Sequence, residues 1–327
     1  MYVLGIDGGG TQTTGIVIDE SGRLHMYART GRSNPNTLSR QAFARVMTDL
    51  MQMLSAQNPL IYGQVTCCFA GLAGVGESGK EEEVADLLSG LLPENTSIIV
   101  RNDAFNALYA GTLGAAGIVQ IAGTGSITFG VNQHGDTARS GGWGYLFDDE
   151  GSGFYIGNEA LRHLFKAHDG RGQSTSLSHR LLHHFSVASI PDIIHVIYGE
   201  EHPRSVIAPL SRYVVEEALE GDIVAKNIIN AACGKMLESI EACRRQLFAD
   251  KDVTTIILSG GVFTGADLCR QVVAEMAKIR LPTVTFQTPQ VEPVVGAALA
   301  GLAAVEGQPA NGFVARINSE LHRKAML

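Results

Sequence analysis

The chain has 327 residues, of which 45% are hydrophobic and 18% charged, and it carries a net charge of −8 at pH 7. This composition predicts a large folded core and excludes a disordered chain, and the length favours about two domains. The acidic balance argues against nucleic acid as a partner. We expect neither a membrane span nor a signal peptide, because no apolar run reaches about 18 residues and no basic leader precedes the first strand.

The first predicted elements form a hairpin with an unusual turn. The stretch "LGIDGGGTQTTGIVID" runs from one apolar strand through Asp7, three glycines and three threonines into a second strand. A plain hairpin needs only about two residues with positive φ, so this turn is richer in polar groups than its geometry requires. The glycines would let backbone N–H groups approach a phosphate, and Thr11 and Thr13 would add hydroxyl donors. Asp7 could hold Mg²⁺ directly or through water.

The rest of the chain reads as a mixture of strands and helices, which predicts an α/β fold. Strands are expected near 2–7, 13–19, 24–30, 64–70, 97–101, 117–122, 127–132, 255–259 and 283–287. Helices are expected near 39–56, 80–91, 103–111, 152–166, 175–185, 189–198, 204–220, 222–249, 265–279 and 293–305.

The stretch "GVGESGK" (74–80) matches the G-x-x-x-x-G-K pattern of a phosphate-binding P-loop. The pattern also needs Ser or Thr at the next position, to bind Mg²⁺, and Glu81 stands there. Three glutamates, 81–83, fill the first helical turn, where they satisfy the positive helix end and would repel a phosphate. We interpret this stretch as an acidic helix start after a flexible loop.

Asn102 and Asp103 in "RNDAFNA" fall where a predicted strand ends and a helix begins. Polar residues at the carboxyl ends of strands line the ligand crevice of open α/β sheets. Asp103 also suits a helix N-cap, so a structural and a catalytic role are both open for it at this point.

A repeat relates two parts of the chain. The stretch "IAGTGSITFGV" (121–131) matches "IDGGGTQTTGI" (6–16) at five of eleven positions, 115 residues further on. This similarity predicts two related domains that face each other, in which Gly123, Thr124 and Gly125 form a second phosphate loop. With two such loops on one cleft, we favour Asp103 as a general base. A third glycine turn, Gly260 and Gly261, follows an apolar strand.

The stretch "SGGWGYLFDDEGSGFYIG" (140–157) holds the single tryptophan of the chain, Trp143, next to Asp148, Asp149 and Glu150. Trp143 could be a core residue or could cover the apolar face of a sugar whose hydroxyls bind the carboxylates. Paired carboxylates also occur in glycoside hydrolases, but that activity would leave both phosphate loops unexplained.

The five cysteines are odd in number and form no C-x-x-C pair, which argues against a disulfide framework and a zinc knuckle. We therefore expect a reducing, cytoplasmic location. His179 and His183 have metal-ligand spacing, but no Glu or Cys partner lies near them, so we expect a solvated helix face.

Taken together, these motifs resemble the actin-like ATPase/sugar-kinase superfamily over about residues 1–305. "GIDGGGTQTT" and "IAGTGSIT" resemble its two phosphate motifs, "LSGGVF" its adenosine motif and "RNDAFNA" its first connecting segment. "GGWGYLFDDEGSG" narrows the resemblance to the BadF/BadG/BcrA/BcrD-type family, in the branch that contains N-acetylglucosamine kinases.

The resemblance implies two ribonuclease-H-like domains, 1–114 and 115–327, with a nucleotide and sugar cleft between them. The second domain would carry a helical insertion, and the last helix, about 293–327, would return to the first domain. The implied activity is ATP-dependent phosphorylation of an amino sugar, foremost N-acetylglucosamine at its 6-hydroxyl, with ATP and Mg²⁺ as cofactors. Alternatives are a kinase of N-acetylmuramic acid or glucosamine, an ATPase acting on a partner protein, and a non-enzymatic sensor. A homodimer is a further expectation.

The resemblance also implies roles for individual residues. Asp103 would be the catalytic base and Asp7 the magnesium-associated aspartate. The nucleotide would contact Gly8, Gly9, Gly10, Thr11, Thr13, Gly123, Thr124, Gly125, Gly260 and Gly261. The sugar would contact Asn34, Asn102, Asp103, Gly142, Trp143 and Asp149.

Overall fold

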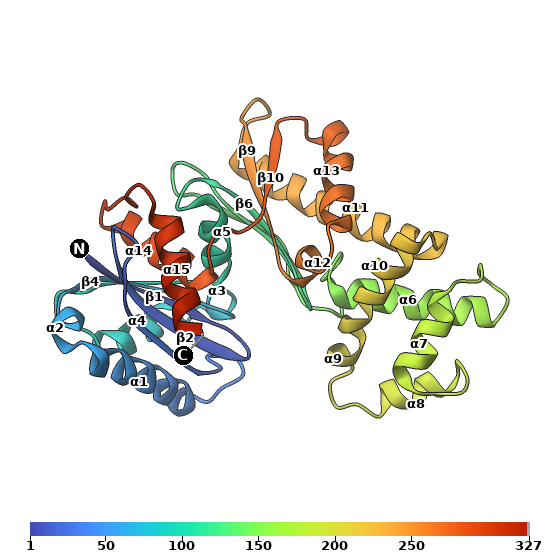
Figure 1. Cartoon of the computed structure of the whole chain (residues 1–327), viewed down its shortest axis with the longest axis horizontal. Coiled ribbons are helices and arrows are strands. Elements are labelled where there is room, and N and C mark those ends of the chain that lie inside the picture. The colour runs from blue at the N-terminus through green and yellow to red at the C-terminus, as the bar shows by residue number, and fades with distance from the viewer. Residues whose placement is uncertain (326–327) are drawn as a thin grey trace. The chain divides into compact units, whose positions relative to one another are not determined.

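The computed structural model describes residues 1–325 and divides into two compact units (Figure 1). Unit 1 comprises residues 1–115 and the segment from 289 onward, and unit 2 comprises residues 116–288. The expected boundary between separately folding domains at 114/115 stays a prediction. Residues 326 and 327, the end of the predicted last helix, lie outside the described residues.

Unit 1 is built on a mixed sheet with the strand order β3-β2-β1-β4-β5. Its strands are β1 (Tyr2–Gly8), β2 (Gln12–Asp19), β3 (Leu24–Gly31), β4 (Val65–Leu72) and β5 (Ser97–Arg101). Strand β2 runs antiparallel to both of its neighbours, β1 and β3, whereas β4 and β5 run parallel to β1.

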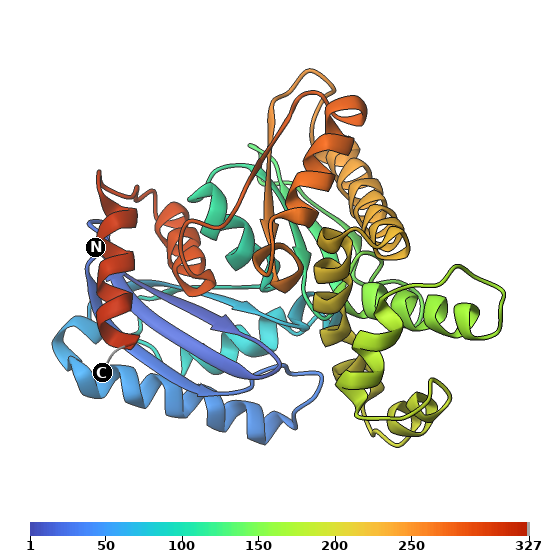
Figure 2. The same cartoon turned by 45° about the vertical axis from the view of Figure 1, so that its right-hand side comes forward.

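Helices cover both faces of this sheet because its strands are apolar on both sides. On β1, Leu4 and Ile6 pack against α1 (Arg40–Gln57) and α4 (Glu81–Ser89). Val3 points the other way, into a cluster with α14 (Pro293–Ala304) and α15 (Phe313–Ala325). Figures 1 and 2 show α1 in blue and α15 in red on these opposite faces. The remaining helices of unit 1 are α2 (Pro59–Tyr62), α3 (Val75–Ser78) and α5 (Ala104–Thr112).

Small residues let α14 approach its neighbours closely. A Cβ at Gly5 would lie 2.7 Å from the carbonyl oxygen of Val294, and a Cβ at Gly296 would collide with the backbone of α5 at Asn106. Helix α14 therefore holds α5 firmly against the sheet, which fixes the position of the residues at the start of α5.

Unit 2 repeats the same sheet, because the order β8-β7-β6-β9-β10 corresponds to β3-β2-β1-β4-β5. Its strands are β6 (Gly117–Ala122), β7 (Ser126–Val131), β8 (Thr137–Gly141), β9 (Thr254–Ser259) and β10 (Val284–Gln287). The α/β fold class and the predicted duplication are confirmed. The match is not residue by residue, since the pairs Gly8–Thr13 and Ala122–Ser126 leave four residues in the first turn and three in the second.

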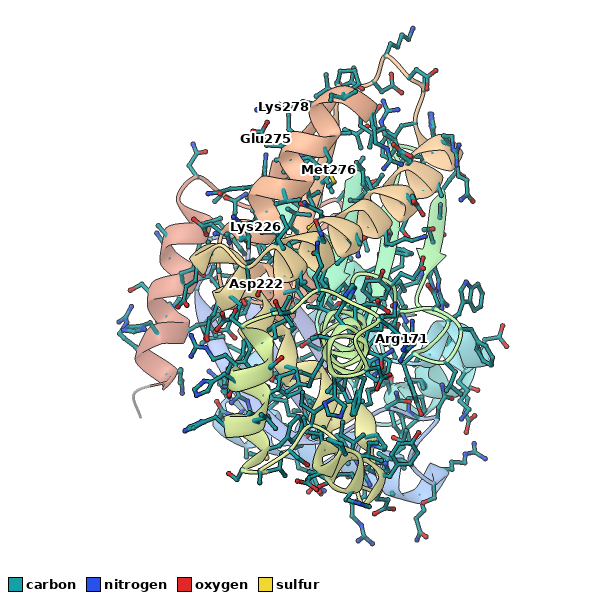
Figure 3. All side chains as sticks on the ribbon, turned by 90° about the vertical axis from the view of Figure 1, so that its right-hand side faces the viewer. Arg171, Asp222, Lys226, Glu275, Met276 and Lys278 are labelled. Atoms are coloured by element: carbon teal, nitrogen blue, oxygen red, sulfur yellow. The ribbon has the colours of Figure 1, made fainter. Side chains whose placement is uncertain are left out.

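A helical insertion lies between β8 and β9 of unit 2. Its helices are α6 (Gly153–His168), α7 (Leu177–Phe185), α8 (Asp192–Tyr198), α9 (Pro203–Ile207), η1 (Ala208–Leu210), α10 (Ser211–Glu220) and α11 (Ile223–Leu247). Two further helices follow β9, α12 (Gly261–Thr264) and α13 (Leu268–Arg280). The expected helix 204–220 is wrong as a single element, because it breaks around Pro209, which has no N–H to donate. Asp222 (Figure 3) caps α11 by accepting a 2.8 Å hydrogen bond from the Ala225 amide.

Among the helices of residues 1–325, none combines the length and the hydrophobicity that crossing a bilayer requires.

Candidate active-site residues

The carboxyl ends of three parallel strands meet at one edge of the unit 1 sheet. Asp7 and Gly8 end β1, Leu72 ends β4, and Asn102 and Asp103 directly follow β5. The structure therefore brings the two predicted carboxylates, 96 positions apart in the chain, to the same sheet edge. This edge is where open α/β sheets bind their ligands.

Asp7 is a carboxylate whose surroundings favour a bound cation. Its Oδ1 accepts a 2.7 Å hydrogen bond from Asn106 Nδ2. Burial raises the pKa of Asp7, the Asn106 hydrogen bond opposes this rise in part, and the charge of Glu292 adds to it. The Oδ1 atom of Asn106 is buried and has no partner among the described residues. A desolvated carboxylate beside an orphaned amide oxygen fits a magnesium site that completes its shell with water and phosphate oxygens.

Asp103 occupies the N-cap position of α5, but its side chain makes no capping hydrogen bond. Instead, Asn102 Oδ1 accepts a 2.9 Å hydrogen bond from the Ala104 amide. This bond gives the predicted sugar residue Asn102 a structural function at the helix start. Asp103 and Asn106 are three residues apart and lie on one face of the helix start, and Asn106 reaches Asp7.

The glycines of the first turn have different reasons for being glycine. A Cβ at Gly8 would collide with Ser33 Oγ and Leu72 Cδ2, so Gly8 serves packing. Gly9 and Gly10 have ample space and no positive φ. Nothing in the described protein requires glycine there, which fits a ligand that comes close to the backbone.

Thr11 and Thr13 lie in different surroundings. Thr11 is exposed in the turn, whereas Thr13 is fully buried and its Oγ1 donates a 2.7 Å hydrogen bond to the Gly31 carbonyl. The Thr13 hydroxyl therefore joins β2 to β3, and its phosphate contact stays a prediction.

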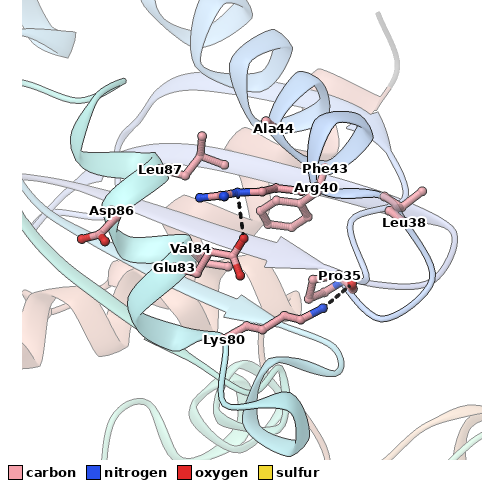
Figure 4. Close-up of a pocket in the computed structure, with 10 residues that line it drawn as sticks. All are labelled: Pro35, Leu38, Arg40, Phe43, Ala44, Lys80, Glu83, Val84, Asp86 and Leu87. Atoms are coloured by element: carbon pink, nitrogen blue, oxygen red, sulfur yellow. Dashed lines mark hydrogen bonds and ion pairs between the residues drawn. The ribbon is translucent and has the colours of Figure 1, made fainter.

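Asn34 lies in a turn that is held by the segment 74–80. Its Oδ1 accepts from the Asn36 amide at 2.9 Å, and Asn36 Nδ2 donates to the Gly74 carbonyl at 2.9 Å. At the other end of the segment, Lys80 Nζ donates to the Pro35 carbonyl at 2.8 Å (Figure 4). The lysine of "GVGESGK" thus positions a predicted sugar-binding turn, which agrees with the interpretation that this stretch is not a P-loop.

A small cavity of about 280 Å³ adjoins this turn between α1 and α4. Its walls include the apolar side chains of Phe43 and Val84, and the Arg40–Glu83 ion pair at 2.9 Å bridges it (Figure 4). Glu83, from the acidic first turn of α4, thus forms an exposed ion pair with α1, and such pairs contribute little to stability.

The second glycine turn, in unit 2, leaves two donors unused. The Gly123 amide donates to the Gly125 carbonyl at 2.9 Å, and the Ser126 amide donates to Asp149 Oδ1 at 3.2 Å. The amides of Thr124 and Gly125 have no acceptor within residues 1–325. These two N–H groups are available to an anion.

A cavity of about 780 Å³ opens beside this turn, within the size range of small-molecule sites. Its lining includes the predicted residues Gly123, Thr124 and Gly261, together with Arg204 and Ala208. Gly261 has open space, while Gly260 has φ +102° and packs on the backbone of Ala122. The lining from α9, η1 and α10 was missed, because no local motif marks those residues as close to a glycine turn.

The loop that follows β8 presents Trp143 to solvent. Its side chain is 69% exposed, and the Arg139 guanidinium lies 4.3 Å from the ring centroid. The Trp143 amide donates to Asp148 Oδ2 at 3.1 Å, and Gly142 has φ +75°. Trp143 is therefore no core residue, and its ring is accessible to a ligand.

Asp149 is the buried carboxylate of this loop, with 4% exposure and a left-handed φ of 58°. It accepts hydrogen bonds from the Ser126 amide at 3.2 Å and from Arg204 Nη2 at 2.8 Å. The strained backbone and the two donors hold this carboxylate beside the second glycine turn.

The other chemically reactive residues form no comparable site. All five cysteines are buried and free of disulfides, and burial raises the pKa of Cys67 to about 11. Residues 1–325 contain no group of three or more His, Cys, Asp or Glu side chains placed to hold a metal ion. Nδ1 of His184, next to the predicted pair, lies 3.1 Å from Tyr213 Oη.

This duplicated arrangement is the fold of the actin-like ATPases and sugar kinases. The chain belongs to the BadF/BadG/BcrA/BcrD ATPase family, whose sequence profile matches residues 4–301. The predicted family is thereby confirmed.

Individual relatives extend this comparison. The chain is 30% identical over 298 residues to the N-acetylmuramic acid/N-acetylglucosamine kinase of Clostridium acetobutylicum, covering 91% of this chain and 97% of that protein. A Chromobacterium violaceum structure proposed to be an N-acetylglucosamine kinase shares the fold with a TM-score of 0.68 at 23% identity, covering 91% and 98% of the two chains. A ROK family glucokinase from Streptomyces griseus, in complex with glucose and AMPPNP, has a TM-score of 0.58 at 15% identity, with 94% and 100% covered.

Proposed function

We propose that this chain is an ATP-dependent amino-sugar kinase that transfers the γ-phosphoryl group of ATP to the 6-hydroxyl of N-acetylglucosamine. The observation that carries the proposal is the position of Asp103, which directly follows β5 on a capped helix start and is linked through Asn106 to Asp7. Membership of an ATPase family and similarity to a kinase of N-acetylated amino sugars support it.

Asp103 acts as the general base of the proposed reaction. Its carboxylate takes the proton of the acceptor hydroxyl as the hydroxyl oxygen forms a bond to the γ-phosphorus, and the bond from that phosphorus to the β,γ-bridging oxygen breaks. ADP leaves with the electron pair of that bond. Magnesium associated with Asp7 would neutralise charge on the phosphate oxygens.

The nucleotide is bound largely by backbone groups. In unit 1, the open backbone at Gly9 and Gly10 and the exposed Thr11 approach phosphate. In unit 2, the unused amides of Thr124 and Gly125 face an anion, and the cavity next to Gly261 accepts the nucleoside. This arrangement suits a chain of net charge −8, because backbone amides bind phosphate without a basic patch.

Asn34, Trp143 and Asp149 bind the sugar in this proposal. The Trp143 ring covers an apolar sugar face, and the amide and carboxylate groups bond to hydroxyls. A cytoplasmic location fits the five unpaired thiols.

A coupled ADP-release assay tests the proposal with N-acetylglucosamine, N-acetylmuramic acid, N-acetylmannosamine and glucosamine, each with Mg²⁺ and ATP. We expect the highest kcat/KM with N-acetylglucosamine, and mass spectrometry should identify its 6-phosphate. ADP release that is the same with and without every sugar would overturn the kinase assignment and favour an ATPase. A clear preference for another sugar would overturn the substrate assignment alone.

Replacing Lys80 by Met is expected to raise KM for the sugar about tenfold and to change kcat little. The lost charge-assisted hydrogen bond to the Pro35 carbonyl would loosen the turn that carries Asn34. Steady-state kinetics measure this effect. Lys278→Met is the matched control, because Lys278 pairs only with the exposed Glu275 on α13 (Figure 3) and its loss should leave KM unchanged. A folded Lys80→Met protein with a normal sugar KM would contradict the positioning role.

A further inference from the structure

Arg204 bonds to a proposed sugar-binding residue and also lines the cavity proposed for the nucleotide. From α9, its Nη2 donates to Asp149 Oδ2 at 2.8 Å, and Asp149 is the buried carboxylate proposed to bind the sugar. The same side chain lines the 780 Å³ cavity proposed for the nucleotide, together with Thr124 and Gly261. The Arg204 guanidinium thus lies between the proposed sugar-binding carboxylate and the proposed nucleotide cavity, all within unit 2.

The guanidinium has bonding capacity left over. Its Nε is buried and has no partner among the described residues, while the side chain as a whole remains 35% exposed. An arginine offers five N–H donors in a planar fork, which matches phosphate oxygens as well as carboxylates. The ring of Tyr145 lies 5.5 Å from its Cζ and supports the fork from one side.

The second glycine turn is shaped around this ion pair. A Cβ at Gly125 would collide with Arg204 Nη2 and would lie 2.9 Å from Asp149 Oδ2. The backbone at Gly125 therefore packs directly against the Arg204–Asp149 ion pair. The unused amides of Thr124 and Gly125 belong to this same turn. An anion bound by these amides would lie close to the guanidinium.

Asp149 depends on its partner. A carboxylate with 4% exposure has little contact with water, so the hydrogen bonds that it accepts from the protein hold it in place. Its donors are the Ser126 amide and Arg204. Any ligand that draws Arg204 away frees Oδ2 to accept a different donor, such as a sugar hydroxyl.

We propose that Arg204 is a positioning residue that couples nucleotide binding to sugar binding. Phosphate oxygens of the bound nucleotide engage the guanidinium and weaken its bond to Asp149, and Asp149 Oδ2 then accepts a hydrogen bond from the sugar. Nucleotide binding consequently increases the affinity for the sugar, and the sugar increases the affinity for the nucleotide by the same factor. This inference rests on the proposed function.

Isothermal titration calorimetry on the full chain tests the coupling. The Kd for N-acetylglucosamine is measured with and without saturating AMPPNP and Mg²⁺, which permit binding without transfer. We expect the nucleotide to tighten sugar binding about five- to fiftyfold in the unsubstituted protein. The coupling ratio is the Kd for the sugar without nucleotide divided by the Kd with nucleotide. In Arg204→Gln this ratio should fall to within about twofold of one. Arg204→Lys keeps the charge but loses the planar fork, so its ratio should lie between those of Arg204→Gln and the unsubstituted protein.

Arg212→Gln is the matched control. Arg212 lines the same cavity and stacks on Tyr213 at 4.5 Å, so its loss removes the same charge without touching Asp149. It should lower nucleotide affinity at most and keep the coupling ratio. Gly125→Ala is a second test, since the added Cβ displaces the ion pair while both charges remain, and it should also reduce the ratio.

Two outcomes would overturn the inference. One is a ratio near one in the unsubstituted protein, and the other is a ratio in folded Arg204→Gln equal to that of the unsubstituted protein. If Arg204→Gln does not fold, as judged by circular dichroism, an unchanged ratio in Gly125→Ala overturns the inference instead. The ADP-release assay on the unsubstituted protein separates these results from a failure of the proposed function, because sugar phosphorylation does not depend on the coupling ratio.

Discussion

Asp103→Asn is expected to lower kcat by at least about 10²-fold, with KM for ATP and sugar changed by less than about threefold. Asparagine keeps the size and polarity of the side chain but cannot take a proton from the acceptor hydroxyl. The melting temperature is measured beside kcat, so that a loss of turnover can be separated from a loss of stability. Steady-state kinetics and thermal denaturation measure the two effects.

The neighbouring residue provides the matched control for this experiment. Asn102→Ala removes the 2.9 Å cap on the Ala104 amide and is expected to cost about 1 kcal/mol of unfolding free energy. Its kcat should fall far less than that of Asp103→Asn. Near-normal turnover in Asp103→Asn, or a loss of kcat that merely follows a loss of stability in both variants, would contradict the assignment of a general base.

Asp7→Asn is expected to raise the Mg²⁺ concentration for half-maximal activity by about 10- to 100-fold while making the protein more stable at pH 7. Burial raises the pKa of Asp7 in the folded state above its value of 3.8 in the unfolded chain. The fold therefore prefers the neutral carboxyl, and stability from this group is present below the unfolded value and is lost as the pH rises through the folded one. Asparagine is neutral at every pH and avoids this loss.

The gain in melting temperature should consequently be present at pH 7 and shrink as the pH falls towards 4. Asp86→Asn is the control, because it removes the same charge from an exposed position on α4 and should leave the magnesium requirement unchanged. A less stable Asp7→Asn protein at pH 7, or one with an ordinary magnesium requirement, would contradict the proposed role of Asp7.

Local sequence patterns were sufficient for the parts of the fold that depend on neighbouring residues. The two glycine hairpins, their duplication and most helices follow from apolar periodicity and turn residues within about 20 positions. Elements with little apolar signal were less well predicted. Strand β8, which buries only Ala138, was missed, and the expected last helix of about 293–327 is two helices, α14 and α15. Among the described side chains of α15, Phe313, Ile317 and Leu321 are buried against the sheet of unit 1.

The site divides in the same way. The sequence indicated Asp7, Asp103 and the glycine turns, because the motif of each is contiguous in the chain. The burial of Thr13 was not predicted, since it results from pairing with β3.

The amino-acid sequence by itself thus determined the α/β class, the duplication and the family, because glycine, aspartate and apolar periodicity act over short distances. Only the tertiary structure decided which partners these residues have. Asn106 meets Asp7 across 99 positions, Arg204 meets Asp149 across 55, and Lys80 meets Pro35 across 45. Such contacts depend on how sheets and helices pack, and the free energy that holds them comes from burial shared by the whole unit.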